Sequence, residues 1–411
     1  MAKIVSCIYL IGMWVYTFGV RVASLFSDKA KLLTAGRRDT WKKLESYDNS
    51  SKCIWIHAAS LGEFEQGRPL MEAIREKYPD RKIVLTFYSP SGYEVRKNFK
   101  IADLVCYLPA DGPCNAKKFI EKINPEMVFF VKYEFWHFYL KALKNKNIPT
   151  YGVSMIFRKQ QAFFKWYGGW FRDMLKCFDF MYIQNQTSAE LLDGINIKKY
   201  AVVGDTRFDR VAKIAASSAN VELVEKFVEG AKMVLVAGSS WEPDEDVILP
   251  YINDERNDIK LIIAPHEIHD ERVKRLTDNL KVRYCLYTNP VDDINNCKVL
   301  VINTIGLLST IYKYGQIAYV GGGFGVGIHN TLEAATYGMP VIFGPNYKRF
   351  NEACDLIEKG AGFCVHDNKE FTDIIEKFDS DKSSLATAGE QADKYVKSMC
   401  GATDRILKDL F

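Results

Sequence analysis

The sequence lacks the patterns that hold metal ions in compact sites. Ten cysteines are scattered from Cys7 to Cys400, and none forms a C-x-x-C pair. Only six histidines are present, and His266 and His269, three residues apart, have no third ligand nearby. No cysteine and histidine group has zinc-ligand spacing. We therefore predict free thiols in a reducing compartment, with no protein-bound metal and no cofactor.

A strong net charge is also absent. The chain carries 55 Lys and Arg against 51 Asp and Glu, a formal net charge of +4. So small a charge argues against a protein that wraps nucleic acid. Hydrophobic residues make up 48% and charged residues 26%, which excludes disordered, collagen-like and coiled-coil chains. No internal repeat or low-complexity tract is visible, and 411 residues predict two or three domains.

One long apolar run opens the chain. Residues Ile4 to Val20 carry no charge, and basic residues follow from Arg21 onward. The run lacks a basic start and a small-x-small site, which disfavours a cleaved signal peptide. Three alternatives stay open: a short membrane span, an interfacial helix, or a buried helix of the first domain. The basic flank favours membrane association from the cytoplasmic side.

Strand-length apolar runs alternate with amphipathic stretches from residue 52 onward. They are not alternating in polarity, which is typical of strands covered on both faces in a parallel sheet. We predict strands at Cys53–His57, Lys82–Phe87, Met127–Val131, Thr150–Ser154, Phe180–Gln184 and Tyr200–Val203, and then at Met233–Ala237, Lys260–Ala264, Val299–Ile302, Gln316–Val320, Pro340–Phe343 and Gly362–Val365.

The polar stretch at 209–222 separates the two series of strands. The predicted fold class is therefore α/β, with two doubly wound domains that face a cleft and an apolar N-terminal helix. The expected segments are a membrane-associating helix at 1–26, an N-terminal domain at 27–212, a C-terminal domain at 213–388 and a C-terminal helix at 389–411. Ligands should bind beyond the carboxyl ends of the strands.

Carboxylates follow two of the predicted strands in the first domain. Ser60 and Glu63 have the spacing of a capping box at the start of a helix. Glu63 either caps that helix or acts as a general base, since a helix N-terminus favours an ionised carboxylate. Lys132, Glu134 and Trp136 follow the strand at 127–131 and lie either at the solvated rim of the sheet or in the cleft.

Three further segments suit an anionic ligand. Arg207 either binds a phosphate or pairs with a neighbouring aspartate. Ser239 and Glu242 again have capping-box spacing, so the helix start that follows the second-domain strand could hold an anion.

The glycine-rich stretch 321–327 matches neither the G-x-G-x-x-G nor the Walker A pattern. It predicts a loop with close backbone approach. The loop leads into Asn330, a predicted helix cap, and Glu333, which either completes that cap or accepts ribose hydroxyls.

Taken in order, these segments resemble one family, the 3-deoxy-D-manno-octulosonic acid (Kdo) transferases of lipid A and lipopolysaccharide biosynthesis, which are glycosyltransferases of the GT-B fold. The resemblance spans most of the chain. It rests on H-A-A-S-L-G-E at 57–63, E-F-W at 134–136, G-D-T-R-F-D at 204–209, G-S-S-W-E at 238–242, N-T-I-G at 303–306, G-G-G-F at 321–324 and H-N-T-L-E at 329–333.

The resemblance implies an inverting transfer of Kdo from CMP-Kdo to the tetraacyl glucosamine disaccharide phosphate precursor of lipid A. It implies an enzyme on the cytoplasmic face of the inner membrane, with no metal and no nucleic acid partner. Glu63 matches the general base and Glu134 a second functional carboxylate. The expected acceptor residues are Ser60, Gly62, Lys132 and Trp136, and the expected donor residues are Arg207, Ser239, Ser240, Gly322, Gly323, His329, Asn330 and Glu333.

The chain departs from the usual family pattern at several positions. Lys132 replaces an acid, His137-Phe138 replaces Pro-Asn, Glu267 follows His266 where an arginine-containing P-R-H motif is usual, and Leu307 replaces an acid. We expect Arg207 or the helix N-termini to supply the missing positive charge.

Two other functions remain as alternatives. One is a different nucleotide-sugar enzyme of similar fold, such as an epimerase, and the other is a non-catalytic membrane glycolipid-binding protein. The apolar amino end argues against the first, and the presence of both Glu63 and Glu134 argues against the second.

Overall fold

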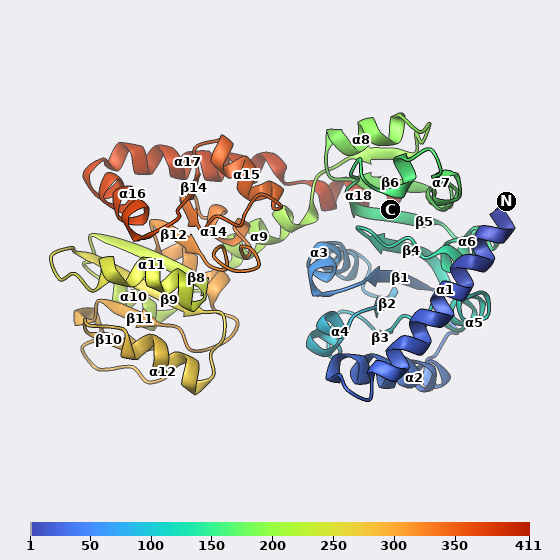
Figure 1. Ribbon diagram of the computed structural model, residues 1–411, viewed down its shortest axis with the longest axis horizontal. Coiled ribbons are helices and arrows are strands. Elements are labelled where there is room, and N and C mark those ends of the chain that lie inside the picture. Colours follow the sequence, from blue (N-terminus) through green and yellow to red (C-terminus); the bar gives the residue numbers. More distant parts are fainter. Residues whose placement is uncertain (1) are drawn as a thin grey trace. The chain divides into compact units, whose positions relative to one another are not determined.

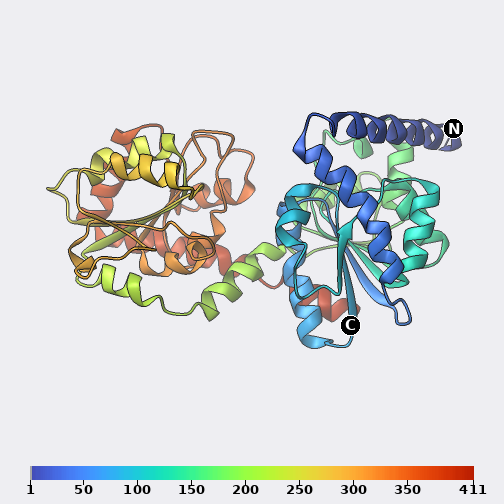
Figure 2. The same cartoon turned by 90° about the horizontal axis from the view of Figure 1, so that it is seen from below.

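The computed structural model describes residues 2–411, which divide into two compact units (Figure 1). Unit 1 comprises the chain up to Asp209 together with Gly401–Phe411, and unit 2 comprises Arg210–Cys400. Each unit is built on one seven-stranded parallel sheet with helices on both faces (Figure 2). This architecture confirms the predicted α/β fold class with two doubly wound domains.

The sheet of unit 1 has the strand order β3-β2-β1-β4-β5-β6-β7. Its strands are β1 Cys53–Ala58, β2 Lys82–Phe87, β3 Leu104–Tyr107, β4 Pro125–Val131, β5 Thr150–Met155, β6 Phe180–Ile183 and β7 Tyr200–Val202. Its helices are α1 Ala2–Ala23, α2 Asp28–Ser46, α3 Leu61–Lys77, α4 Pro90–Arg96, α5 Pro113–Ile123, α6 His137–Asn145, α7 Gly169–Leu175, α8 Gln186–Asp193 and α18 Ala402–Leu410, with a short 3₁₀ turn at Ala162–Phe164.

The sheet of unit 2 has the strand order β10-β11-β9-β8-β12-β13-β14. Its strands are β8 Met233–Ser240, β9 Ile259–Pro265, β10 Tyr284–Leu286, β11 Val299–Val301, β12 Ile317–Val320, β13 Val341–Phe343 and β14 Gly362–Cys364. Its helices are α10 Glu222–Val228, α11 Glu242–Ile252, α12 Asp270–Asp278, α13 Leu308–Ile311, α14 Leu332–Ala335, α15 Asn351–Glu358, α16 Asn368–Ser380 and α17 Lys382–Met399, with 3₁₀ turns at Ile294–Asn296 and Tyr312–Tyr314.

The central strands are buried on both faces, which explains why they are apolar throughout. All six residues of β1 are buried. Trp55 packs in the core on one face of the sheet, and Ile54 and Ile56 pack in the core on the other. A strand with alternating polarity could not fill both cores, so the continuous apolar run is what this position requires.

Two elements join the units along the chain. Helix α9 (Thr206–Ser217) runs from unit 1 into unit 2. After Cys400 the chain returns to unit 1, where Ile406 of α18 belongs to the same buried core cluster as Ile74 of α3. The segment 389–411, predicted as one C-terminal helix, is thus shared between α17, which ends at Met399, and α18. The predicted boundary at 212 lies within α9.

Helix α1 lies along the outside of unit 1 (Figure 1). It has one contacting side: the Tyr9 hydroxyl donates to Asp111 at 2.7 Å, and the Ser6 hydroxyl lies 3.0 Å from Nε2 of His137. No side chain of residues 3–23 is fully buried. In the described structure α1 is therefore a surface helix, and the alternative of a buried helix in the first domain is wrong.

Asp111 connects α1 to the start of α6. Its carboxylate accepts the Tyr9 hydroxyl and the backbone N–H groups of Phe138 and Tyr139, at 3.1 and 3.2 Å. Burial raises the pKa of Asp111 to about 6, although these donors act in the opposite direction. The carboxylate thus satisfies three donors while it remains costly to ionise.

This buried carboxylate predicts a specific pH dependence of stability. The pKa of Asp111 lies above the value of about 3.9 expected in the unfolded chain. Its contribution to the free energy of unfolding is therefore full below about pH 4 and is lost as the pH rises through about 6. Relative to Asp111→Asn, the wild type should lose about 1 kcal/mol between pH 5 and pH 7 in urea unfolding. Asp80→Asn, at an exposed site, should change nothing, and a pH-independent difference for Asp111→Asn would contradict the expectation.

Candidate functional site

The predicted site residues of unit 1 follow two neighbouring strands. Strands β1 and β4 pair in parallel, with His57 opposite Phe130. Ser60 and Glu63 follow β1, and Lys132, Glu134 and Trp136 follow β4. Because parallel strands end at the same edge of the sheet, the structure brings these side chains together.

A chain of hydrogen bonds fixes Glu134 at this edge. Oε2 of Glu134 lies 3.1 Å from Nε2 of His57 and accepts the indole N–H of Trp136 at 2.7 Å. Nδ1 of His57 lies 2.8 Å from the Thr86 hydroxyl, which accepts the indole N–H of Trp55 at 2.8 Å. His57 is fully buried and Glu134 nearly so.

The partners of His57 assign its tautomer. A carboxylate oxygen can only accept, so we assign the ring proton to Nε2 of His57, which donates to Glu134, while Nδ1 accepts from the Thr86 hydroxyl. The Trp136 indole N–H also lies 3.1 Å from this Nε2, but its shorter hydrogen bond is the one to Glu134. All donors in this chain point toward the Glu134 carboxylate, so its position is set by buried side chains rather than by solvent.

Glu63 lies at the same edge but is more exposed than Glu134. Ser60 occupies the N-cap of α3, as predicted, but its hydroxyl donates to the Glu63 carboxylate and accepts no backbone N–H of the helix. The expected capping box is therefore replaced by a direct side-chain bond. Lys132, whose φ of +67° is left-handed, has its Nζ 3.8 Å from Oε1 of Glu63. Gly62 is exposed on the first turn of α3.

Arg207 forms the local pair that the sequence left open. Its Nε and backbone N–H donate to Asp205 at 3.0 and 2.9 Å, and Nη2 lies 2.9 Å from the same carboxylate. Asp205 is buried and also accepts from the Gln66 side chain at 2.8 Å. Arg207 belongs to unit 1, whereas the other predicted donor residues lie in unit 2.

In unit 2, the two serines after β8 differ in their surroundings. Ser240 is buried, and its hydroxyl donates to Glu245 at 2.7 Å. Glu245 also forms a buried ion pair with Arg272 at 2.5 Å. Ser239 has a positive φ of +54° and stays partly exposed. Of the two hydroxyls, Ser239 is thus the one that a ligand could reach.

The predicted cap at Ser239 is wrong. Helix α11 begins at Glu242 with Trp241 at its N-cap, and the Trp241 N–H donates to Asp244 at 2.9 Å. Asp244 also accepts from the Gly322 N–H at 2.8 Å and from the Tyr319 hydroxyl at 2.9 Å. Burial raises the pKa of Asp244. One buried aspartate therefore ties the start of α11 to the glycine-rich loop.

The glycine-rich loop follows β12, the neighbour of β8. Gly322 has φ +92°, which only glycine adopts without strain. A Cβ on Gly323 would lie 2.5 Å from the backbone of Gly344, and one on Gly321 would lie 2.3 Å from the Ser239 carbonyl oxygen. The glycines are thus required by close backbone approach, as predicted.

Three rings stack beside this loop. His266 lies 4.6 Å from Trp241 and 4.4 Å from His329, ring centroid to centroid. The Trp241 indole N–H donates to Nε2 of His329 at 3.2 Å. Burial, with a smaller effect of His266, lowers the pKa of His329 to about 4. His329 is therefore neutral near pH 7 and brings no positive charge to the loop.

Asn330 and Glu333 are bonded to each other at the start of α14. The side-chain amide of Asn330 donates to Oε1 of Glu333 at 2.9 Å. The predicted cap is displaced by one residue, because the N-cap of α14 is Thr331. Asn330 still accepts the Leu332 N–H at 3.2 Å. Glu333 is thus held by a neutral donor, on the same loop as His329.

Within residues 2–411, no three His, Cys, Asp or Glu side chains are grouped to hold a metal ion. Several residues of these sites were not predicted as such: His57, Thr86, Asp205 and Asp244. Thr86 and Asp244 are buried side chains outside the quoted motifs, where a single sequence offers no pattern to find them. His57 and Asp205 lie inside motifs that the sequence singled out.

Comparisons with known proteins place these sites in context. A family model described as 3-deoxy-D-manno-octulosonic-acid transferase (kdotransferase) matches residues 35–210. A 3-deoxy-D-manno-octulosonic acid transferase of Aquifex aeolicus is 27% identical over 86% of this chain and 93% of its own length. One from Rickettsia prowazekii is 24% identical over 84% of this chain and 76% of its own length.

A solved structure shows the same fold at lower identity. UDP-GlcNAc 2-epimerase from Neisseria meningitidis, bound to UDP-GlcNAc, superposes with a TM-score of 0.60 over 88% of this chain and 99% of that one. It is 15% identical, so the likeness supports the arrangement of two parallel α/β sheets and not a shared reaction.

Proposed function

We propose that this chain, which belongs to the Kdo transferase family of glycosyltransferases, transfers Kdo from CMP-Kdo to a tetraacyl glucosamine disaccharide phosphate, the precursor of lipid A. The transfer inverts the anomeric centre. The observation that carries this proposal is the pair of carboxylates, Glu63 and Glu134, at one edge of the sheet in the segment that the family model matches.

Glu63 is the general base in this proposal. A sugar hydroxyl of the acceptor gives its proton to the Glu63 carboxylate as its oxygen bonds the anomeric carbon of Kdo, and the bond from that carbon to the CMP phosphate oxygen breaks. Glu63 suits the role because, among the described residues, only the Ser60 hydroxyl and a lysine 3.8 Å away hold its carboxylate. Glu134, with two N–H donors on one oxygen, suits a fixed acceptor that orients the substrate.

Unit 2 is the donor-binding unit in this proposal. Those backbone N–H groups of the glycine-rich loop that are not already bonded to Asp244 or to backbone carbonyls face the CMP phosphate, and Glu333 accepts the ribose hydroxyls. Because His329 is neutral near pH 7, it adds no charge to the stabilisation of the leaving phosphate, which the backbone dipoles of the loop support. The sequence suggested two sources for the missing positive charge, Arg207 and the helix N-termini. Arg207 is already paired with Asp205, so it is the weaker source of the two.

The proposal also places unit 1 against the cytoplasmic face of the inner membrane. Helix α1 is long and apolar enough to cross a membrane, but its Ser6 and Tyr9 contact unit 1. Apolar side chains at helical spacing point away from that contact, namely Ile4, Ile8, Ile11, Val15, Phe18 and Val22. This arrangement favours a helix that lies in the interface with its apolar stripe in the lipid.

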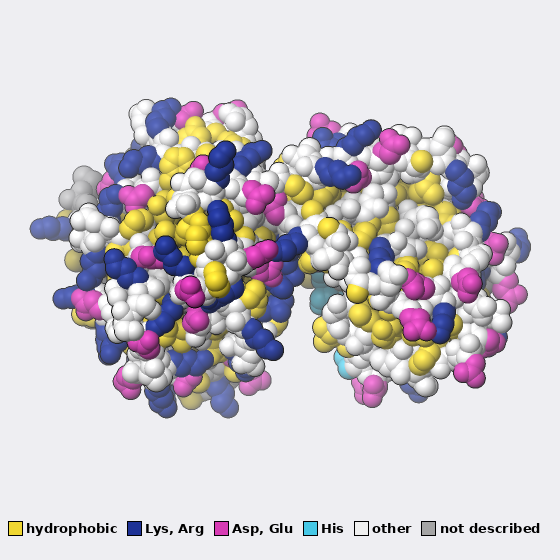
Figure 3. Space-filling view, turned by 180° about the vertical axis from the view of Figure 1, so that it is seen from behind, with side chains coloured by type: hydrophobic (Ala, Val, Ile, Leu, Met, Phe, Trp, Pro, Cys, Tyr) yellow, Lys and Arg dark blue, Asp and Glu magenta, His cyan; other side chains and the backbone are white. Residues whose placement is uncertain are grey.

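The charge of the two units supports the same orientation. Unit 1 carries 34 Lys and Arg against 23 Asp and Glu, a net +11, and unit 2 carries 21 against 28, a net −7. Figure 3 shows dense Lys and Arg side chains over unit 1 on the face drawn. Anionic lipid therefore attracts unit 1 and repels unit 2. Trp166, exposed beside α7, adds an aromatic side chain of the kind found at membrane interfaces.

The role of Glu63 is tested by Glu63→Gln. Turnover with CMP-Kdo and the tetraacyl acceptor should fall roughly 10²–10⁴-fold, because the amide cannot take the proton. The fold should be retained, since the amide oxygen still accepts from Ser60. Glu72→Gln, on the same helix and paired with Arg68, is the matched control and should keep full turnover. Near wild-type turnover of Glu63→Gln would remove Glu63 from the mechanism.

The donor site is tested by calorimetry with CMP. Glu333→Ala should weaken CMP binding roughly tenfold, because hydrogen bonds from the ribose hydroxyls to a carboxylate are lost. Binding of the acceptor lipid should persist. Glu370→Ala, at an exposed ion pair with His366, controls for the lost charge in unit 2. An unchanged CMP affinity would mean that Glu333 only orients Asn330.

The membrane orientation is tested by substitutions in the α1 stripe. Ile8→Ser with Phe18→Ser should lower cosedimentation with anionic vesicles roughly tenfold or more, since two large apolar side chains lose their burial in lipid. The contacts of Ser6 and Tyr9 stay intact, which removal of residues 1–26 would not allow. Val95→Ser with Val291→Ser, at exposed apolar sites elsewhere, should bind like the wild type. Equal binding of all three proteins would refute an interfacial α1.

A further inference from the structure

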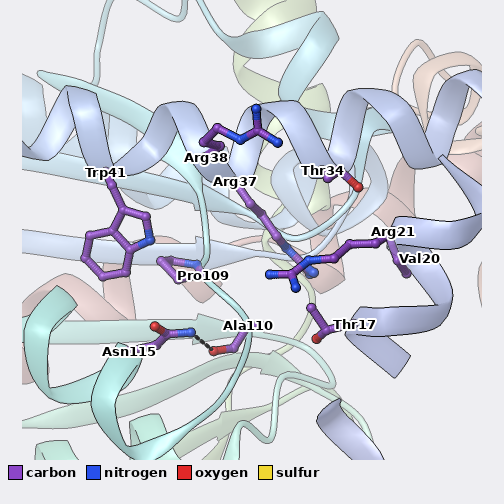
Figure 4. A pocket seen from close by; sticks show the side chains of 10 residues that line it. All are labelled: Thr17, Val20, Arg21, Thr34, Arg37, Arg38, Trp41, Pro109, Ala110 and Asn115. Carbon is purple, nitrogen blue, oxygen red and sulfur yellow. Dashed lines mark hydrogen bonds between the residues drawn. The ribbon is translucent and has the colours of Figure 1, made fainter. Parts of the chain in front are cut away.

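A pocket of about 310 Å³ lies in unit 1 where α1 crosses α2 (Figure 4). Arg21 enters it from α1, and Arg37, Arg38 and Thr34 come from α2. The loop after β3 closes one side with Ala110. Figure 4 shows the Arg21 side chain reaching toward Arg37. The pocket is separate from the sheet edge that carries Glu63 and Glu134, none of whose residues line it.

Polar atoms in this pocket are buried without a partner. Nε and Nη2 of Arg37 and the hydroxyl of Thr34 make no hydrogen bond within the described residues. The Arg37 guanidinium stacks over the ring of Tyr88 at 4.5 Å, a contact that gives neither of these two nitrogens an acceptor. Buried donors without acceptors are costly, and a guanidinium more so than an amide. A bound acceptor would remove that cost.

The charge of the pocket specifies an anion. No Asp or Glu lines it, and no ion pair within residues 2–411 involves Arg21, Arg37 or Arg38. A buried carboxylate, Asp111, lines an adjoining pocket and already accepts three hydrogen bonds. Guanidinium groups that converge repel one another until an anion lies between them. Their forked N–H edges match the oxygens of a phosphate.

The adjoining pocket indicates what carries the anion. It measures about 400 Å³ and shares Thr17 and Arg21 with the first. Met13, Trp14 and Phe18 line it, and the last two are about two-thirds exposed. The cationic pocket thus opens onto an apolar pocket on α1, the helix that we propose lies in the lipid. This combination fits an anion that carries a hydrocarbon tail.

We infer that Arg21 and Arg37 bind the phosphate of a membrane amphiphile, whose apolar part lies along Trp14 and Phe18. The phosphate joins α1 to α2 and satisfies the unpartnered N–H groups of Arg37. Such binding needs no turnover, so it holds whatever sugar the chain transfers and whether or not Glu63 is the base.

Vesicle binding of the full chain tests this site. Two sets of phosphatidylcholine vesicles, one with phosphatidic acid and one with oleate, are matched in surface potential at about 0.15 M salt, where long-range attraction is screened. The wild type should prefer the phosphatidic acid vesicles, and Arg21→Gln with Arg37→Gln should lose that preference, about tenfold. Lys29→Gln with Lys42→Gln, on exposed sites of α2, removes the same charge outside the pocket and should keep the preference.

Thermal unfolding provides a second measurement. Phosphatidic acid vesicles should raise the Tm of the wild type and of the lysine control but not that of the arginine variant. Without lipid, Arg37→Gln should lower the Tm only slightly, because it removes the stacking on Tyr88 but also two buried nitrogens that have no acceptor. Equal losses in the arginine and lysine variants would reduce the effect to surface charge and overturn the site. Equal stabilisation by soluble inorganic phosphate would overturn the amphiphile as its ligand.

Discussion

The hydrogen bond between the buried side chains of His57 and Glu134 underlies the arrangement of unit 1. His57 is the penultimate residue of the central strand β1, and its imidazole can enter the core only because Thr86 and Glu134 satisfy both ring nitrogens. Glu134 in turn fixes the Trp136 indole, and Trp136 stacks on Tyr88 at 4.5 Å. Tyr88 stacks on Tyr16 of α1 at 6.3 Å. A continuous series of contacts thus runs from the core of the sheet to the surface helix.

Much of this fold could be predicted because the central strands are apolar on both faces. All twelve predicted runs contain a strand, but β3 and β10 were missed. Both lie at the ends of their sheets, and β10 is three residues long with Tyr284 exposed, so its sequence has little apolar signal. Such short edge strands are defined by the neighbour they pair with, and the sequence does not contain that information.

The candidate sites were predictable to a different extent. Glu63 and Glu134 stand next to apolar runs, so their place at a sheet edge followed from the order of residues. The approach of Lys132 to Glu63 depends on the left-handed backbone of Lys132, a conformation that a lysine gives no reason to expect. The cap at Ser239 failed for a similar reason. Asp244, fixed by Gly322 and Tyr319 from a neighbouring strand and its loop, outcompeted the local pairings that short-range spacing suggests.

The return of the chain to unit 1 after Cys400 makes unit 2 an insertion. Asp209, the last residue of unit 1 before the crossing, accepts the backbone N–H groups of Gly401 and Thr403, the latter at 2.7 Å. Phe411 then stacks on Tyr78 at 4.8 Å. Residues 210–400 can therefore be excised as one continuous fragment. A fragment that ends at Asp209 would instead leave the α3 surface bare, so a gene for unit 1 alone must rejoin Asp209 to Gly401.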